Sequence, residues 1–356
     1  RSYHAPMRPS AADPDAFRAL PKAELHQHLD GSLRPQTAVE LATDAGMPLT
    51  ADDAVRRMVA PAHGASQAEL LAFFDLPISL LQTGPALRRA AAELVHDLAD
   101  DGVRYAEIRW APRLHLERGL SVSEVIEAVA AGVADGRARV EPARCPLVGL
   151  IVTAMRSHPP GANVLLARSA AEFGAPVIGF DLAGLESEYP APPHAAAFRA
   201  AAEGGLALTA HAGEVRGPER VREVLAFGVR RVAHGVTAIE DPELVATLRH
   251  DGTTLDLCPT SNVQAGVVQS LELHPLARLH RAGVSVTLST DDRTVTGITL
   301  SQEYARVTSA LALTAGELRD IAVNAFRRAF AAPALLRDAL ADAEAAWGAW
   351  ASAAIS

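Results

Sequence analysis

The stretch AELHQHL at residues 23–29 is a short strand-like run that ends in two histidines. Seven similar runs follow it, and most are separated by Ala- and Leu-rich stretches with helical periodicity. These runs occupy residues 103–110, 147–154, 177–183, 206–211, 230–235, 253–258 and 284–290. Strands that alternate with helices predict parallel βαβ units, and eight such units in 356 residues predict a closed (β/α)8 TIM barrel.

The connections between these runs extend the prediction to the whole chain. Residues 121–140 and 217–228 read as crossover helices, and residues 317–354 read as helices that close the barrel. Residues 30–102 are too long for one crossover, so we expect two or three helices there, including one at 68–83. No low-complexity linker divides the chain, which predicts a single domain over 1–356. Within it we expect residues 1–15 to form an extended N-terminal arm, partly a cloning remnant.

Composition excludes several classes of function. The net charge of −9 and the pI of about 5.8 argue against a nucleic-acid partner, which would need a basic surface. The sequence contains no run of about 18 apolar residues, so it predicts no membrane span. No signal peptide is apparent at its start. The two cysteines have no CxxC spacing, so we expect reduced thiols in a cytoplasmic protein.

Ionisable residues stand where the predicted strands end, and a barrel gathers all these ends on one rim. A single histidine there is more simply a hydrogen-bonded core residue. A whole set is hard to explain by packing, because each unpaired buried polar group costs about 1–3 kcal/mol. The set comprises His26, His28, Asp181, His211, His234, Asp291 and Asp292.

His26 and His28 carry the sharpest signal. Residues two apart in a strand point the same way, so their imidazoles converge inside the barrel and suit Zn²⁺. His211 and Asp291 can complete a set of three nitrogens and one oxygen, and a bound water would become acidic enough to supply hydroxide at neutral pH. Four protein ligands plus water predict a five-coordinate site.

Only one metal per chain is expected. Barrels with two metals usually need a bridging ligand on the fourth strand, often a modified lysine. The sole lysine, Lys22, lies just before the first strand. The alternative HxE/PCxxC zinc deaminase pattern is absent, since Cys258-Pro259 has no second cysteine.

Two further residues suit proton transfer. Glu214 lies three residues after His211, and a buried carboxyl beside a metal can act as a general acid. Alternatively, Glu214 is a structural glutamate in the first turn of a helix, where the helix dipole favours a negative charge. His234 could hold or deprotonate the attacking water, or it could be a hydrogen-bonded core histidine.

With these residues in place, the chain resembles the adenosine deaminase family over nearly its whole length. Seven motifs carry the resemblance in the family's order and spacing. They are AELHQHLDGS (23–32), GVRYAEIRWAP (102–112), GFDLAG (179–184), TAHAGE (209–214), RVAHG (231–235), CPTSN (258–262) and LSTDD (288–292).

The resemblance implies a role for each matching residue. It implies zinc ligation by His26, His28, His211 and Asp291, with His28 also contacting substrate. Glu214 would protonate purine N1, and His234 would assist the hydroxide that attacks C6 before ammonia leaves. The base and ribose would be read by Asp292 near N7, by the Gly184 N–H at N3, and by Asp30 on the 5′ side.

The substrate stays open between adenosine and a 5′-modified adenine nucleoside. Asp30 follows HxHL as in nucleoside-acting relatives, whereas adenine-acting ones tend to carry Glu there. Arg293 stands where many adenosine deaminases have Pro, and some relatives act on 6-aminodeoxyfutalosine, which carries a 5′ aryl-carboxylate. The candidates to bind that acid are Arg109, Arg113, Arg156 and Arg293. The alternative functions are those of an adenine deaminase, of another mononuclear-zinc amidohydrolase, and of a barrel that only binds a ligand.

Overall fold

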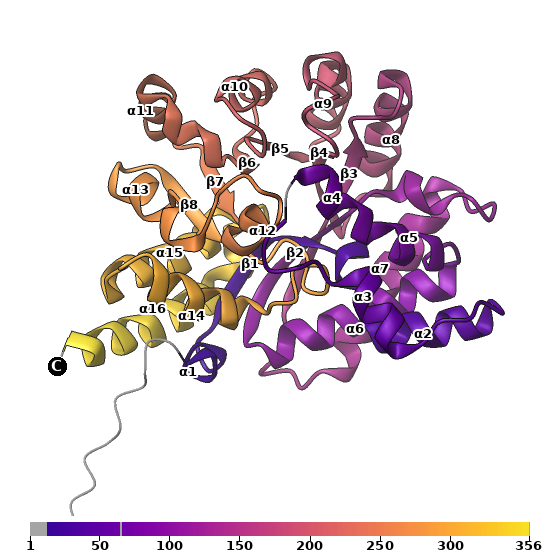
Figure 1. The fold of residues 1–356 in the computed structure, drawn as a ribbon, viewed down its shortest axis with the longest axis horizontal. Helices are drawn as coiled ribbons and strands as arrows, with labels where there is room; N and C mark the ends of the chain where they lie inside the picture. The colour runs from indigo at the N-terminus through magenta and orange to yellow at the C-terminus, as the bar shows by residue number, and fades with distance from the viewer. Residues whose placement is uncertain (1–12, 65, 356) are drawn as a thin grey trace, which may run out of the picture.

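The computed structural model describes residues 13–64 and 66–355, and it contains one sheet of eight parallel strands in sequential order. Helices surround the strands, as Figure 1 shows in a view down the shortest axis. This architecture confirms the predicted (β/α)8 TIM barrel. The strands are β1 (Lys22–His28), β2 (Val103–Trp110), β3 (Leu147–Met155), β4 (Val177–Ala183), β5 (Ala207–Ala212), β6 (Arg231–His234), β7 (Thr254–Leu257) and β8 (Ser285–Leu288).

The barrel closes between β8 and β1 at the residues that the sequence singled out. Gln27 forms a parallel bridge with Asp291. The His28 N–H donates to the Asp291 carbonyl at 2.7 Å, and the Asp291 N–H donates to the His26 carbonyl at 3.1 Å. Closing the sheet therefore brings the first and last motifs of the chain into contact.

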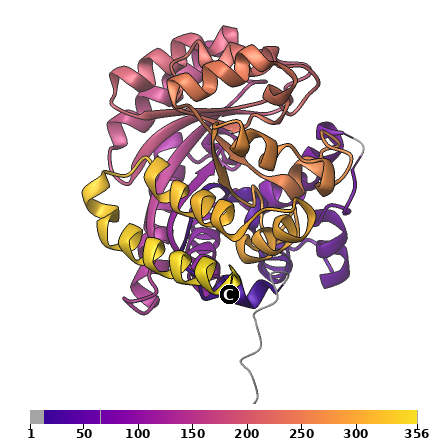
Figure 2. The ribbon, with the colours of Figure 1, turned by 90° about the vertical axis from the view of Figure 1, so that its left-hand side faces the viewer.

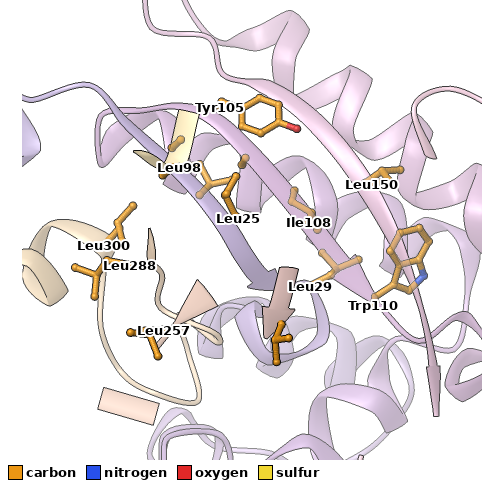
Figure 3. Close-up of a cluster of buried hydrophobic side chains, with 14 of the residues drawn as sticks. Leu25, Leu29, Leu98, Tyr105, Ile108, Trp110, Leu150, Leu257, Leu288 and Leu300 are labelled. Carbon is orange, nitrogen blue, oxygen red and sulfur yellow. The ribbon is translucent and has the colours of Figure 1, made fainter. Parts of the chain in front are cut away.

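The strands are buried because they are covered on both sides. β2 and β4 are buried along almost their whole length, as expected for parallel strands packed under helices. Figure 3 shows part of the resulting core, where Leu25 of β1 lies near Ile108 of β2, with Leu288 of β8 and Leu300 nearby. This packing fixes the strand ends on which the polar residues stand.

Seven helices connect the strands from β2 onward, at the positions that strand–helix alternation predicts. Figure 2 shows them from the side, packed along the outside of the sheet. They are α7 (Val122–Arg139), α8 (Pro160–Phe173), α9 (Ala195–Glu203), α10 (Glu219–Leu225), α11 (Pro242–Asp251), α12 (Pro259–Gln264) and α13 (Leu276–Arg281).

The segment between β1 and β2 differs from the prediction. It contains five α-helices rather than two or three, and the single helix expected at 68–83 is interrupted by the 3-10 turn Ala72–Phe74. Pro77 gives the reason: it has no N–H to donate, so it is tolerated only near the start of a helix, and a new helix begins at Asp75. The five are α2 (Pro35–Asp44), α3 (Ala51–Met58), α4 (Gln67–Leu71), α5 (Asp75–Leu80) and α6 (Gly84–Asp100).

The chain ends pack beside each other. α14 (Leu300–Ala310), α15 (Ala315–Arg328) and α16 (Pro333–Ile355) follow β8, in agreement with the helices expected at 317–354. Of the arm expected over 1–15, residues 1–12 lie outside the described part, and α1 (Pro14–Arg18) already begins at Pro14. None of the described helices is long and apolar enough to cross a membrane. Cys145 and Cys258 are both free thiols.

A polar cluster fills the barrel interior toward the amino ends of the strands. Arg231 at the start of β6 forms ion pairs with Glu107 of β2 and, at 3.0 Å, with Asp256 of β7. Strands β2 and β6 stand on opposite sides of the barrel, so this ion pair crosses the interior. Tyr105 and Thr287 donate to the two carboxylates, each at 2.7 Å. We call these five residues the amino-end cluster.

Candidate active site

A pocket opens at the carboxyl ends of the strands. This end of a barrel is where active sites lie. Its walls combine strand-end polar residues with apolar residues from the segment between β1 and β2. The lining residues are His28, Asp30, Gln67, Leu70, Leu71, Phe74, Ala111, Leu114, Thr153, Met155, Ala183, Gly184, His211, Glu214, His234, Asp291 and Asp292.

Four side chains converge at the floor of this pocket. The Nε2 atoms of His26, His28 and His211 lie 3.1–3.3 Å from one another. Asp291 Oδ1 lies 2.9 Å from the His26 Nε2 and 3.4 Å from the His28 Nε2. Ligand atoms about 2.0–2.2 Å from one zinc ion at tetrahedral angles stand about 3.3 Å apart, so the spacing fits a single metal.

His234 also stands close to this group. Its nitrogen falls within 4.8 Å of the ligand atoms of His26, His211 and Asp291. However, its Nε2 is 3.8 Å from the nearer Asp291 oxygen, whereas the His28 Nε2 is 3.4 Å from an Asp291 oxygen. The shorter distances favour His28 over His234 as the fourth ligand.

Burial favours the neutral imidazole at two of the candidate ligands. Burial lowers the pKa of His26 well below its usual value and that of His28 to about 3. A neutral imidazole has the free lone pair that a metal requires. Burial opposes the charge of Asp291, but His26 and His234 outweigh it and hold the pKa of that carboxyl well below its usual range.

Neighbouring residues fix the orientation of the ligands. Asp181 at the end of β4 accepts from the His211 Nδ1 at 3.1 Å, which leaves Nε2 of that ring as the free nitrogen. The Ser261 hydroxyl donates to Asp291 Oδ2 at 2.7 Å, which leaves Oδ1 facing the histidines. Such supporting contacts are typical of metal sites. Asp181 therefore reaches the rim as predicted, as a partner of His211.

Glu214 lies beside this group in a carboxyl-rich environment. Its Oε1 is 3.3 Å from the His234 Nε2, and its Oε2 accepts from the Gln67 side chain at 2.9 Å. Burial raises the pKa of Glu214 well above its usual value, and the charges of Asp291 and Glu186 add to the shift. This environment therefore favours the protonated form of Glu214, which suits a group that gives up a proton.

Two more carboxyls face the pocket with an unsatisfied oxygen. Asp30 Oδ1 and Asp292 Oδ1 are buried and have no hydrogen-bond partner among residues 13–64 and 66–355. Burial and the neighbouring Asp291 raise the pKa of Asp292 well above normal, so it holds a proton to donate. Gly31 allows its approach, because a Cβ there would stand 1.9 Å from Asp292 Oδ1.

Backbone strain marks the same rim. His234 and Asp291 adopt φ values of 66° and 68°, in the left-handed region that residues with side chains seldom occupy. β6 ends at His234 and β8 at Leu288, one and two residues before the ends of the predicted strands at 230–235 and 284–290. Gly184, with φ of 110°, lines the pocket at the end of β4.

Comparison with known proteins gives a consistent answer. The family model described as adenosine deaminase matches residues 21–346. An adenosine deaminase of Mycobacterium ulcerans is 38% identical over 340 residues, which span 89% of this chain and 92% of that protein. The chain belongs to the adenosine deaminase family. It is accordingly a hydrolytic deaminase.

Solved structures of related enzymes share the fold. An adenine deaminase from Arthrobacter aurescens is 27% identical, with a TM-score of 0.83 over 91% of this chain and 98% of that one. An amidohydrolase from Burkholderia ambifaria with bound zinc is 25% identical, with a TM-score of 0.86 over 99% and 97% of the two chains. In this adenosine deaminase family member, a cluster of three His and one Asp side chains is compatible with a metal.

The four arginines considered for a 5′ acid do not line the pocket. Arg109 is buried against Asp181 and donates to the Leu25 carbonyl. Arg156 donates to the His211 and Tyr189 carbonyls, and Arg293 points to Asp101 at 3.8 Å. These three are engaged within the protein, and each also has one buried nitrogen without a hydrogen-bond partner in the described chain. Arg113 is half-buried, and its Nε likewise has no partner there.

Sequence reasoning missed several residues at the site. Gln67 also accepts from the Glu186 N–H at 3.0 Å, and Glu186 accepts from the N–H groups of Gly213 and Glu214 at 2.9 Å. Asn262 contacts the His234 ring. Asn262 was visible within the CPTSN motif, but nothing in the local pattern around Gln67 or Glu186 signals contact with a residue 147 or 28 positions away.

Lys22 is the first residue of β1, where its Nζ donates to the Phe17 and Leu20 carbonyls, remote from the rim.

Proposed function

We propose that this chain is a zinc-dependent enzyme that replaces the 6-amino group of an adenine nucleoside by oxygen and releases ammonia. The observation that carries the proposal is the convergence of His26, His28, His211 and Asp291 beside the protonated Glu214. Three imidazoles and one carboxylate suit zinc. When bound, one zinc per chain would supply the Lewis acid that activates water at neutral pH.

The other rim residues divide the remaining work. Glu214 gives its proton to purine N1, which makes C6 electrophilic while water attacks there. Protonation at N1 and attack at the adjacent C6 spread the developing charge over two preorganised groups. His234 contacts the attacking oxygen. Glu186 and Gln67 hold Glu214 in place through the contacts described above.

The nucleoside is oriented by groups with a free donor or acceptor. Asp292 carries the proton that N7 needs, because N7 can only accept. The Gly184 N–H serves N3, Asp30 Oδ1 accepts from the ribose 5′-hydroxyl, and His28 packs against the substrate from the floor of the pocket. A free adenine lacks the ribose contact, which supports a nucleoside substrate.

The 5′ side of the pocket supports a neutral substituent. Among the described residues that line it, none is Arg or Lys, and the charged ones are acidic. A 5′ carboxylate would face Asp30 without a compensating cation. Adenosine is therefore the substrate that the site supports best.

A second candidate rests on Arg113. Its free Nε and its position in the turn Pro112–His115, between the lining residues Ala111 and Leu114, would let it approach an acid at the mouth. In that case 6-aminodeoxyfutalosine would be the better substrate.

The test compares kcat/KM of the zinc-loaded enzyme for adenosine, 5′-methylthioadenosine, 6-aminodeoxyfutalosine and adenine, with ammonia release as the readout. We expect adenosine to lead and adenine to trail far behind. Arg113→Ala should leave adenosine unchanged, with Arg293→Ala as the matched control. A selective loss for the acidic nucleoside of roughly 10- to 100-fold would establish the second candidate. Absence of deamination with all four compounds would contradict the proposal.

A further inference from the structure

A chain of buried hydrogen bonds runs from His234 away from the pocket. The His234 Nδ1 lies 3.0 Å from Asn262 Nδ2 on α12, and Asn262 Oδ1 lies 3.1 Å from the His274 Nε2. The backbone N–H of Leu276, at the start of α13, donates to the His274 Nδ1 at 3.2 Å. All three side chains are at least 97% buried. Solvent therefore does not compete for these groups.

The backbone end of this chain sets the direction of every bond. A peptide N–H can only donate, so the His274 Nδ1 must accept. Burial lowers the pKa of His274 to about 3, so the ring is neutral and carries its one proton on Nε2. That N–H donates to Asn262, and the amide must present its oxygen to His274.

The amide then turns its NH₂ toward His234. A flipped Asn262 would place NH₂ against the N–H of His274, two donors face to face, while its oxygen faced His234. The arrangement that satisfies every atom makes the His234 Nδ1 an acceptor. Its proton, in the neutral ring, then sits on Nε2, which points at the pocket 3.3 Å from Glu214 Oε1.

We propose that Asn262 and His274 are positioning residues that hold His234 in the Nε2–H tautomer, so that His234 meets the attacking oxygen as a hydrogen-bond donor and not as a base. The consequence for catalysis rests on the proposed function; the tautomer does not. A donor at that place stabilises negative charge as it develops on oxygen. The proton lost by water then goes to Glu214, which can accept it once its own proton is on N1.

The first test reads the tautomer directly in the zinc-loaded protein labelled with ¹⁵N-histidine. Two-bond ¹H–¹⁵N spectra distinguish protonated from unprotonated ring nitrogens, and His234→Gln assigns the signal. We expect an unprotonated Nδ1 and a protonated Nε2. The reverse pattern would overturn the proposal, whether or not the protein deaminates nucleosides, so the two failures are distinguishable.

The second test reverses the polarity of the chain. In Asn262→Asp the carboxylate can only accept, so it draws the His234 proton to Nδ1 and removes the donor from the pocket. We expect the spectrum to switch and kcat to fall about 10²–10³-fold, with KM and zinc content kept. Under a base role the same change would preserve or raise kcat, which would contradict the proposal.

Further variants distinguish a role in positioning His234 from a general disturbance of the fold. His274→Gln keeps an N–H for Asn262 and should retain most of kcat and the wild-type tautomer, whereas His274→Leu should lose both. Asn163→Asp is a matched control, because Asn163 Nδ2 faces the Nδ1 of another buried histidine, His194, at 3.0 Å. We expect its kcat and His234 spectrum to match wild type. Equal losses in Asn163→Asp and Asn262→Asp would overturn the assignment.

Discussion

The barrel interior holds two buried polar clusters that differ in which groups they bring together. In the amino-end cluster, Glu107 and Asp256 both face Arg231, so opposite charges meet. At the carboxyl rim, like groups meet: three imidazole nitrogens lie within 3.3 Å of one another, and Glu214 stands near Asp291. One cluster is complete within the protein, whereas the other becomes complete when a cation and a substrate enter.

The difference separates structure from function in physical terms. Buried charges are tolerated when they are paired, and removing one partner from a pair leaves an isolated charge. Converging nitrogen lone pairs and unsatisfied carboxyl oxygens instead cost stability in the free protein. A fold retains such groups where the binding of a ligand offsets the destabilisation that they cause. We therefore expect substitutions at the rim to change activity and substitutions in the amino-end cluster to change stability.

The largest effect is expected for Asp291→Ala. It removes the only anionic member of the ligand set, and the three histidines that remain are not a closed site. We expect metal content to fall from one per chain toward zero and kcat/KM to fall more than about 10⁴-fold, because the nucleophile is no longer activated. Elemental analysis with steady-state kinetics checks both. Full metal occupancy in this variant would remove Asp291 from the ligand set.

Glu214→Gln should have the next largest effect, confined to turnover. The amide keeps the size of the side chain but has no acidic proton for N1, and a positioned general acid contributes about 10²–10⁴-fold. We expect kcat to fall in that range, with KM, metal content and melting temperature nearly unchanged. Near-normal turnover would place Glu214 among the structural residues.

Glu107→Gln is the matched substitution in the amino-end cluster. It removes the charge opposite Arg231 and should lower the free energy of unfolding by about 3 kcal/mol. Urea unfolding measures this change, and kcat per folded molecule should match wild type. A Glu107→Gln variant that is stable but inactive would contradict the assignment of stability to the amino-end cluster and of activity to the rim.

Asp30→Ala should have the smallest effect. It removes a charge-assisted contact to the ribose of about 1.5–3 kcal/mol, so kcat/KM for adenosine should fall about 10- to 100-fold. Adenine, which lacks the ribose, should be converted at the wild-type rate. Equal losses for both substrates would mean that Asp30 does not read the 5′ side.

The sequence predicted the fold and the rim because both depend on local order along the chain. Strands at 103–110 and 177–183 agree with β2 and β4 to the residue. Parallel strands must end on one rim, so polar residues that follow them meet, as His26, His211 and Asp291 do. The motif spacing alone was sufficient for this.

What the sequence did not predict depends on side-chain direction. Arg109 and Arg156 point into the protein toward acceptors on other strands, and only tertiary packing decides that. Gln67 begins the short helix α4 and donates to Glu214, a residue 147 positions away, and tertiary packing alone decides this contact. The His274 contact required α12 and α13 to be placed relative to β6.

The central claim is that the rim is a site for one metal, and zinc stoichiometry tests it most directly. The chain is stripped with a chelator, titrated with Zn²⁺ by calorimetry, and assayed with adenosine at each point. We predict one tight zinc per chain, with deaminase activity that rises in step and reaches its plateau at one equivalent. Two tight zinc ions per chain, no tight zinc, or full activity in the stripped protein would contradict this account.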